Sequence, residues 1–225
     1  MAAALPSREQ ILEALVKKQG SSAVEKLQRA TIAVCGLGGL GSNIAISLAR
    51  AGVGKLILID FDKVDITNLH RQQYKMNQVG IPKAEALLQN LKEIAPYVHY
   101  EVHQERVTAE NAVSLLQSAD IICEAFDKAD AKAMLVDTVL EQLPQKYLVA
   151  ASGMASYDSG NAILTRRITD KFYLCGDGQN DVDEVVGLVA PRVMLCAAHQ
   201  ALTADRKSTR LNSSHTDSSR MPSSA

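Results

Sequence analysis

The sequence predicts an α/β fold, in which a doubly wound and mostly parallel sheet carries helices on both faces. Short apolar runs alternate with helical patterns through most of the chain, and this rhythm implies right-handed crossovers between parallel strands. A glycine-rich segment, G-x-G-x-x-G, lies between one such run and the helical pattern that follows it. Together these observations predict a Rossmann-like architecture with a small irregular C-terminal extension.

Apolar patterns locate the individual elements. The runs TIAVCG, KLILID, VHYEV, DIICEAF and KYLVAAS predict strands at 31–36, 55–60, 98–102, 120–126 and 146–152. Segments with helical periodicity predict helices at 40–51, 83–96 and 128–143. Between 153 and 189 the rhythm breaks, and two strand-like runs, NAILTRRI and KFYLC, precede the polar loop GDGQNDVDEVVG. We expect the irregular extension there.

Capping residues mark two further helices. Ser7 and Gln10 have the spacing of a capping box ahead of an apolar stripe that starts at Ile11. Residues 1–30 are therefore predicted to form an N-terminal helical segment. Thr108 is expected to cap a short helix whose apolar residues begin at Ala112.

The composition changes near the end of the chain. From about Asp205 the sequence is rich in serine, and its only large apolar residues are Leu211 and Met221. It resembles translated vector sequence and interrupts the helical pattern APRVMLCAAHQALTA. We expect 31–204 to form one domain, 205–225 to be a disordered and non-native tail, and the native C-terminus to be missing.

Composition and charge narrow the class of protein. Of the 225 residues, 47% are apolar, which is enough for a core, and the net charge is −1. This charge gives no reason to expect binding to nucleic acid or to an anionic membrane. No apolar run approaches the ~20 residues of a membrane span, and the N-terminus lacks the pattern of a secretory signal. We expect a cytoplasmic protein.

The segment GLGGLG predicts a nucleotide-binding site. Gly36 permits the tight turn, Gly38 lets a phosphate approach the backbone, and Gly41 allows the helix to pack closely on the strand. A phosphate at a helix N-terminus gains ~0.3–1 kcal/mol from the helix dipole. Asp60, at the end of the next strand, has the spacing of an acid that binds ribose hydroxyls.

The residues after Asp60 indicate which nucleotide is bound. A second acid, Asp62, is followed by amides and cations that a ribose site does not require: Asn68, Arg71, Gln72 and Lys83. Such a set suits a triphosphate with about four negative charges. An NAD enzyme holds its pyrophosphate largely with backbone amides and gives these side chains no fixed role. The role of Asp62 stays open between supporting the loop and supporting a metal ion.

Asp127, after the run DIICEAF, has two interpretations of equal weight. At the C-terminal end of a strand, its carboxylate could hold Mg²⁺ against phosphate oxygens. It could also be the N-cap of the helix that follows.

Four motifs in order, GLGGLGS, LIDFDKVDITNLHRQ, GIPKAE and EAFDKADAK, resemble the ThiF/MoeB family, the bacterial relatives of ubiquitin-activating enzymes. The resemblance covers about Lys26 to His199 and is strongest to the short ThiF-type adenylyltransferases of the sulfur carrier ThiS. It implies an ATP-binding domain at 31–204 that adenylates the C-terminal Gly-Gly carboxylate of a small ubiquitin-like carrier, in thiamine biosynthesis. It also implies a homodimer.

The resemblance assigns roles residue by residue. Gly39 and Asp60 would contact the nucleoside and its ribose, and Asp127 would hold Mg²⁺. The phosphates would be held by Asn68, Arg71, Gln72 and Lys83. Because the carrier carboxylate is itself the nucleophile, this step needs no catalytic serine, cysteine or base; it needs alignment and charge neutralisation.

Three departures from the family pattern matter. The early R-Y-x-R-Q-like segment is absent, which leaves only Arg8 as a weak candidate for an arginine that reaches a partner subunit. The two zinc-binding C-x-x-C pairs are absent, so we expect no zinc. Cys175 is the one candidate for a carrier-accepting thiol, although a structural role is favoured.

The small residues of AASGMASYDSG, 150–160, are expected to form the channel for the carrier tail.

Three alternatives remain open from the sequence. The first is an NAD-dependent oxidoreductase on the same fold, and the second is an ATP-dependent tRNA-modifying dehydratase related to this family. The negative net charge and the lack of a basic extension weigh against a nucleic-acid partner. The third is a non-catalytic module that binds a carrier protein.

Overall fold

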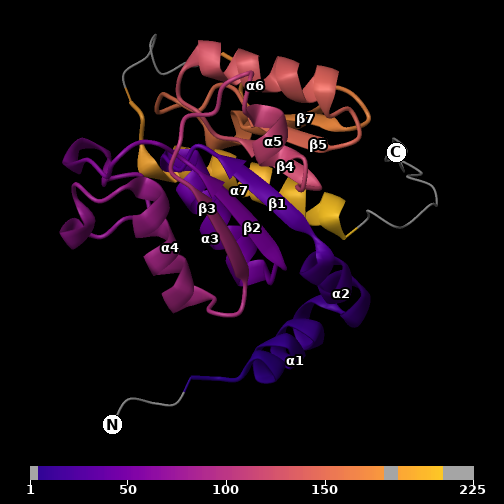
Figure 1. Ribbon diagram of the computed structural model, residues 1–225. Coiled ribbons are helices and arrows are strands. Elements are labelled where there is room, and N and C mark those ends of the chain that lie inside the picture. The colour runs from indigo at the N-terminus through magenta and orange to yellow at the C-terminus, as the bar shows by residue number, and fades with distance from the viewer. Residues whose placement is uncertain (1–4, 180–186, 210–225) are drawn as a thin grey trace, which may run out of the picture.

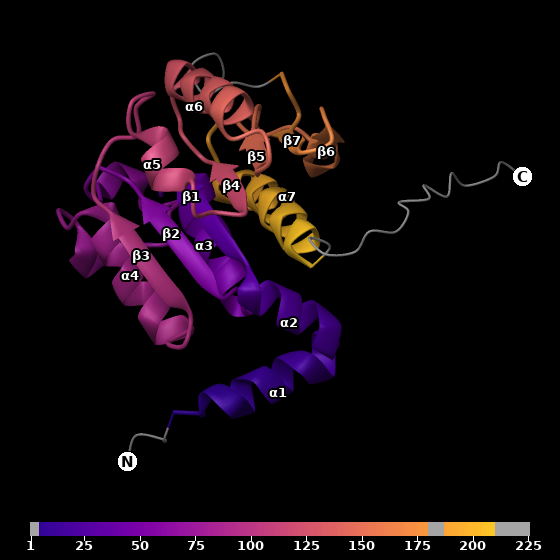
Figure 2. The same cartoon turned by 45° about the vertical axis from the view of Figure 1, so that its right-hand side comes forward.

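The computed structural model describes residues 5–179 and 187–209. Within these residues, seven strands form one sheet in the order β3-β2-β1-β4-β5-β7-β6 (Figures 1 and 2). The strands are β1 Thr31–Cys35, β2 Lys55–Ile59, β3 His99–His103, β4 Ile121–Glu124, β5 Tyr147–Ala151, β6 Leu164–Arg167 and β7 Phe172–Gly176. All neighbouring pairs are parallel except β6 with β7. The predicted α/β class is confirmed.

Helices cover both faces of the sheet (Figure 1). They are α1 Arg8–Gln19, α2 Ser21–Arg29, α3 Gly39–Ala51, α4 Lys83–Ile94, α5 Ala112–Leu116, α6 Ala129–Gln142 and α7 Ala190–Ser208. Three short 3₁₀ helices, η1 Ile66–Asn68, η2 Met76–Gln78 and η3 Gly160–Ala162, lie in the connections. The described helices are all too short or too polar to cross a lipid bilayer.

The two faces of the sheet have separate apolar cores. Along β1, Ile32 and Val34 pack into the core beneath α3, α4 and α7, whereas Ala33 and Cys35 pack into the core beneath α5 and α6. Adjacent strand residues point to opposite faces, so a strand covered on both sides must be apolar throughout. This is why TIAVC reads as an unbroken apolar run.

The order of the strands creates the crevice for a ligand. After β1 the chain turns to β2 on one side, and it later returns to place β4 on the other side of β1. In an open parallel sheet, ligands bind at the carboxyl ends of the strands where the chain direction switches in this way. The glycine segment and Asp127 follow β1 and β4, so both lie at this switch point.

The chain after β5 adds two strands to the main sheet. Strand β7 extends the sheet in parallel beside β5, and β6 adds an antiparallel edge. The two strand-like runs predicted in the irregular section are therefore real strands that widen the domain. Residues 180–186 of the polar loop between β7 and α7 lie outside the described residues.

Two helix boundaries differ from the sequence expectation. Thr108 is not the helix cap, because its hydroxyl bonds the Glu110 side chain and α5 starts only at Ala112. Helix α7 passes the predicted end at Ala204 and reaches Ser208, whose buried hydroxyl donates to the Ala204 carbonyl. The ammonium of Lys207, 4.6 Å from the centre of the Tyr173 ring, adds a tertiary contact. The remainder of the predicted tail, 210–225, lies outside the described residues.

The N-terminal helices form an arm beside the domain (Figure 2). The capping box of Ser7 and Gln10 is present as predicted. In α2, Val24 and Leu27 are buried, but within the described chain no residue of α1 is buried. Its apolar stripe therefore contributes little to the core.

Candidate functional site

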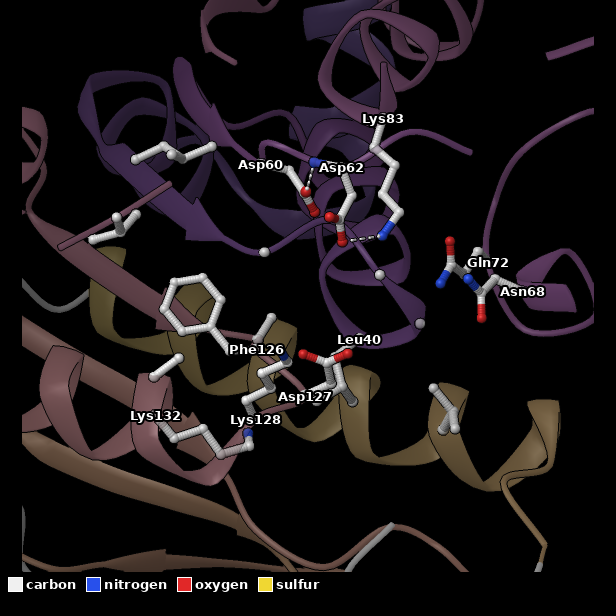
Figure 3. A pocket seen from close by; sticks show the side chains of 18 of the residues that line it. Leu40, Asp60, Asp62, Asn68, Gln72, Lys83, Phe126, Asp127, Lys128 and Lys132 are labelled. Atoms are coloured by element: carbon white, nitrogen blue, oxygen red, sulfur yellow. Dashed lines mark hydrogen bonds and ion pairs between the residues drawn. The ribbon is translucent and has the colours of Figure 1, made fainter. Parts of the chain in front are cut away.

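A cavity of about 880 Å³ lies at the carboxyl ends of the strands. Every predicted site residue except Gly41 lines it: Gly36, Gly38, Gly39, Asp60, Asp62, Asn68, Arg71, Gln72, Lys83 and Asp127. Figure 3 shows that acidic and basic side chains from different loops converge on this cavity. The predicted residues therefore lie together around one cavity, and that this cavity is a functional site, with the roles given to the residues, stays a prediction.

The glycine segment is built for close approach. Gly36 has φ +89°, and a Cβ there would lie 2.8 Å from the carbonyl oxygen of Ala125 on the neighbouring strand end. A Cβ at Gly41 would overlap the Gly36 carbonyl, which explains why Gly41 packs inside rather than lining the cavity. At Gly38, by contrast, only the Gln72 amide lies near. No side chain caps α3, and its first residues, Gly39 and Leu40, line the cavity, so the free amides of this helix end can bind an anion there.

Asp60 holds the glycine segment in place. Its carboxylate accepts hydrogen bonds from the backbone amides of Leu37, at 2.6 Å, and Asp62, at 2.8 Å. Burial raises the pKa of this carboxyl, while the positive charge of Lys83 and the two amides oppose the rise. A carboxylate has about four lone-pair sites, so Asp60 can brace the loop and still accept ribose hydroxyls.

Asp62 pairs with Lys83. The Lys83 ammonium lies 3.0 Å from the Asp62 carboxylate, and the Lys83 backbone amide donates to the Asp62 carbonyl at 2.8 Å. The lysine side chain is only 8% exposed and that of the aspartate 47%. Asp62 therefore anchors the first turn of α4 and orients the lysine, so supporting the loop is the role that its contacts show.

The other side of the cavity presents amides and a guanidinium. Arg71 donates to the Asn68 side chain at 2.9 Å. Burial lowers the pKa of Arg71, while the charge of Asp127 opposes the fall. Gln72 is 7% exposed, and its side-chain oxygen has no hydrogen-bond partner among the described residues. An unpaired buried amide is costly, so this end of the cavity is adapted to a polar ligand.

Asp127 is not the cap of α6. Lys128 occupies the N-cap position of that helix and makes no side-chain capping bond. Asp127 is exposed to the cavity and makes no hydrogen bond among the described residues. The capping interpretation is therefore wrong, and the metal role stays a prediction. In Figure 3 the Asp127 carboxylate lies across the cavity from Lys83 and Asn68.

Across the described ranges, no group of three or more His, Cys, Asp or Glu side chains is arranged to hold a metal. Mg²⁺ commonly binds through one or two carboxylates together with substrate phosphates and water. Asp127 fits that pattern, since its carboxylate is open to the cavity.

The structure adds residues that the sequence reading missed. Arg106 lies 3.9 Å from the centre of the Phe61 ring, and both residues line the cavity with Glu105. Lys132 donates to both oxygens of the fully buried Glu124 at 3.1 Å. Glu105 and Arg106 follow β3 directly, so the rule that located Asp127 at a strand end could have found them.

The remaining candidates lie away from the cavity. Arg8 donates to the Gln28 side chain at 3.0 Å and does not line the cavity. All four cysteines are buried, and burial raises the pKa of the Cys175 thiol. A buried protonated thiol is a poor nucleophile, which supports the structural role of Cys175.

Fold and cavity define a nucleotide-binding class of α/β protein, and comparison with known proteins identifies the family. The chain belongs to the ThiF family, whose model matches residues 8–218. It is 37% identical over 142 residues to "Adenylyltransferase and sulfurtransferase UBA4" of Lodderomyces elongisporus, covering 62% of this chain and 31% of that protein. It is 34% identical over 127 residues to the "Sulfur carrier protein adenylyltransferase" of Thermus thermophilus, covering 56% and 47%. The chain thus spans less than half the length of these relatives.

Solved structures confirm the fold. The E. coli tRNA N6-threonylcarbamoyladenosine dehydratase TcdA, in complex with ATP, matches with a TM-score of 0.81 and 22% identity. That match covers 92% of this chain and 98% of the dehydratase. E. coli MccB with ATP matches with a TM-score of 0.64 and 21% identity, covering 84% and 58%.

Proposed function

We propose that this protein is an ATP-dependent adenylyltransferase that activates the C-terminal Gly-Gly carboxylate of a small ThiS-like sulfur carrier, in thiamine biosynthesis. One observation carries the proposal: the open N-terminus of α3 shares a cavity with Arg71, Lys83 and Asp127. A dinucleotide needs the open helix N-terminus but not the three charged side chains. The names of the curated relatives, sulfur carrier adenylyltransferase among them, support the same reaction class.

ATP would bind with its ribose at Asp60 and its phosphates between the α3 amides and the β2–α4 loop. Gln72 supports this placement, because its side-chain amide nitrogen lies beside Gly38 at the cavity and can donate to a phosphate oxygen. Arg71 offers a planar guanidinium that can bond two phosphate oxygens at once. Lys83 would exchange its bond to Asp62 for one to the triphosphate.

In the reaction, a carboxylate oxygen of the carrier attacks the α-phosphorus, and the bond from that phosphorus to the bridging oxygen breaks. The products are an acyl-adenylate and pyrophosphate, so no proton transfer is needed. The protein aligns two anions, and Arg71 and Lys83 neutralise the charge that grows on the leaving group. Asp127 would hold Mg²⁺, which would supply further positive charge beside the phosphates.

The carrier tail would enter over segment 152–160, where Ser152, Gly153 and Met154 line the cavity next to β5. Small residues at this position permit a peptide backbone to approach the nucleotide. We also propose a homodimer in the cytoplasm, on the family resemblance.

The test is ATP–pyrophosphate exchange with Mg²⁺, with and without a sulfur carrier that ends in Gly-Gly. We expect exchange that requires the carrier and is lost in Arg71→Ala. The same chain with a relative's C-terminal helix in place of 205–225 controls for the foreign-looking tail. If neither chain shows exchange and the protein binds NAD, an oxidoreductase is favoured. If the protein binds the carrier without exchange, a non-catalytic module is favoured.

A second candidate is an ATP-dependent tRNA-modifying dehydratase. It is supported by the likeness to TcdA, which extends over nearly the whole of both chains. A tRNA that carries threonylcarbamoyladenosine, incubated with the protein and ATP, distinguishes the two. Dehydration of the modified base without carrier-dependent exchange would select this candidate.

A further inference from the structure

A buried arginine organises the segment beside the cavity. Arg192, at the start of α7, is only 5% exposed. Its guanidinium donates to the carbonyl oxygens of Ala155 at 2.9 Å, Asp158 at 2.7 Å and Ser159 at 2.8 Å. It also bonds the carboxylate of Asp177, which follows β7 and is equally buried. One side chain thus ties three parts of the chain together: the segment after β5, the end of β7 and the start of α7.

The segment that Arg192 holds has an unusual backbone. Ser156 has φ +82°, a conformation that is strained for a residue with a Cβ and persists only where its surroundings enforce it. Gly153 has φ +75°, and a Cβ there would overlap the Asp177 carboxylate. A Cβ at Gly176 would overlap the Ser152 carbonyl. The two chain segments therefore lie in close contact, and the arginine bonds both of them.

The arginine is adjacent to the cavity but does not face it. Its neighbour Val193 lines the cavity, as do Gly153 and Met154 at the start of the segment. Arg192 itself does not line the cavity, and its donors bond carbonyls of this segment and the carboxylate of Asp177. It acts through the segment and touches no candidate ligand position.

We propose that Arg192 is a positioning residue, which sets segment 153–159 in the conformation that receives the terminal residues of the carrier. This inference rests on the function proposed above. A guanidinium has donors in a fixed planar fork and matches acceptors that lie in several set directions, whereas an ammonium cannot reproduce that geometry. The fork pre-orders the receiving segment, so the carrier does not have to order it on binding.

The test compares Arg192→Lys with the unsubstituted protein in carrier-dependent ATP–pyrophosphate exchange. We expect the KM for the carrier to rise by about 10-fold or more, because small misplacements of a receiving segment are costly. The equilibrium binding of ATP should be unchanged, since its proposed contacts lie at the start of α3, in the connection from β2 to α4 and after β4. Arg167→Met is the matched control, because Arg167 is exposed and pairs with Asp170 at the surface.

A double variant separates positioning from charge balance. Removing Arg192 alone takes away a buried cation that bonds the Asp177 carboxylate, and this lowers the Tm. In Arg192→Met/Asp177→Asn both charges are gone, so we expect the Tm to recover most of the loss while the carrier KM stays raised. Gly153→Ala is a third variant; it shifts the same segment without removing a buried charge, and should also raise the carrier KM.

The outcomes are distinct. Exchange in the unsubstituted protein with an unchanged carrier KM in the folded variants would overturn this inference alone. A double variant that recovers both Tm and carrier KM would show that Arg192 only balances charge, and failure of all three variants to fold would show a purely structural role; either overturns the inference. Absence of carrier-dependent exchange in the unsubstituted protein would overturn the proposed function and this inference with it.

Discussion

The two sides of the cavity use their cations differently. On the side formed by the β2–α4 loop, which we call the phosphate side, Arg71 and Lys83 line the cavity. Arg71 bonds the Asn68 side chain and lies 3.4 Å from a ring nitrogen of His70, and Lys83 pairs with Asp62. On the side formed by β5 and α7, which we call the carrier side, Arg192 is buried and bonded to three carbonyls and a carboxylate. The cations of the phosphate side are available to a ligand, whereas the guanidinium of Arg192 is bonded within the fold.

This difference follows from what each side is proposed to bind. A triphosphate brings its own charge, so the protein must offer cations that it can redirect without a large loss. A glycine-rich peptide tail brings little charge, so the protein must offer a shaped backbone instead. Shape at a strained segment has to be enforced by buried contacts. The predictions below test this division, from the largest expected effect to the smallest.

Asp127→Ala should have the largest effect on activity. If the carboxylate holds Mg²⁺ against the phosphates, carrier-dependent exchange should fall by about 1000-fold, while the Tm changes little because Asp127 makes no hydrogen bond in the described chain. Asp137→Ala, an exposed change on helix α6, which follows Asp127, is the control. Full activity of Asp127→Ala at the usual Mg²⁺ concentration would remove the metal assignment.

Lys132→Met should have the largest effect on stability. Glu124 is fully buried, and Lys132 is its cation at 3.1 Å, so removal of the lysine leaves a buried charge unpaired. We expect a loss of about 3 kcal/mol in the free energy of unfolding, measured by urea titration. Glu124→Gln/Lys132→Met should regain much of it. A loss under 1 kcal/mol in the single variant, on the scale of ordinary surface changes, would contradict the importance of this pair.

Arg71→Ala should lower kcat/KM by about 100-fold with little change in Tm, because its fork is proposed to act on phosphates rather than on the fold. Arg71→Lys should recover only part of this loss, since an ammonium cannot bond two oxygens in one plane. Initial rates at several ATP concentrations provide the measurement. If Arg71→Ala instead unfolds the protein, Arg71 stabilises the fold as Arg192 does, and the proposed difference between the two sides of the cavity is wrong.

Asp60 should give a small pH effect of defined sign. Burial raises its pKa above the ordinary value of 3.8, so the folded state binds this proton more tightly than the unfolded state. The stability from this proton is fully present below about pH 3.8 and is lost as pH rises through the folded pKa. Stability against pH should therefore fall in this window by up to about 1.4 kcal/mol per unit of pKa rise. The fall should be absent in Asp60→Asn; an identical slope in both proteins would refute the assignment.

Local patterns made the strands, the glycine turn and the strand-end acids predictable. Gly36, Asp60 and Asp127 each follow a run of apolar residues, and parallel strands carry whatever follows them to one edge of the sheet. The ends of the helices were harder to predict. Thr108 could have capped its helix on local grounds, and only its bond to Glu110 shows why it does not.

The sequence by itself determined the parallel sheet, the glycine loop and the set of polar side chains at the cavity, because these depend on periodicity and on spacing along the chain. Only the tertiary structure decided which charges are paired. Asp62 meets Lys83, Glu124 meets Lys132, and Asp177 meets Arg192. The physical reason is that the partner of a charge is set by which strand ends and helix starts adjoin in space. That adjacency comes from packing the whole sheet, and no local pattern encodes it.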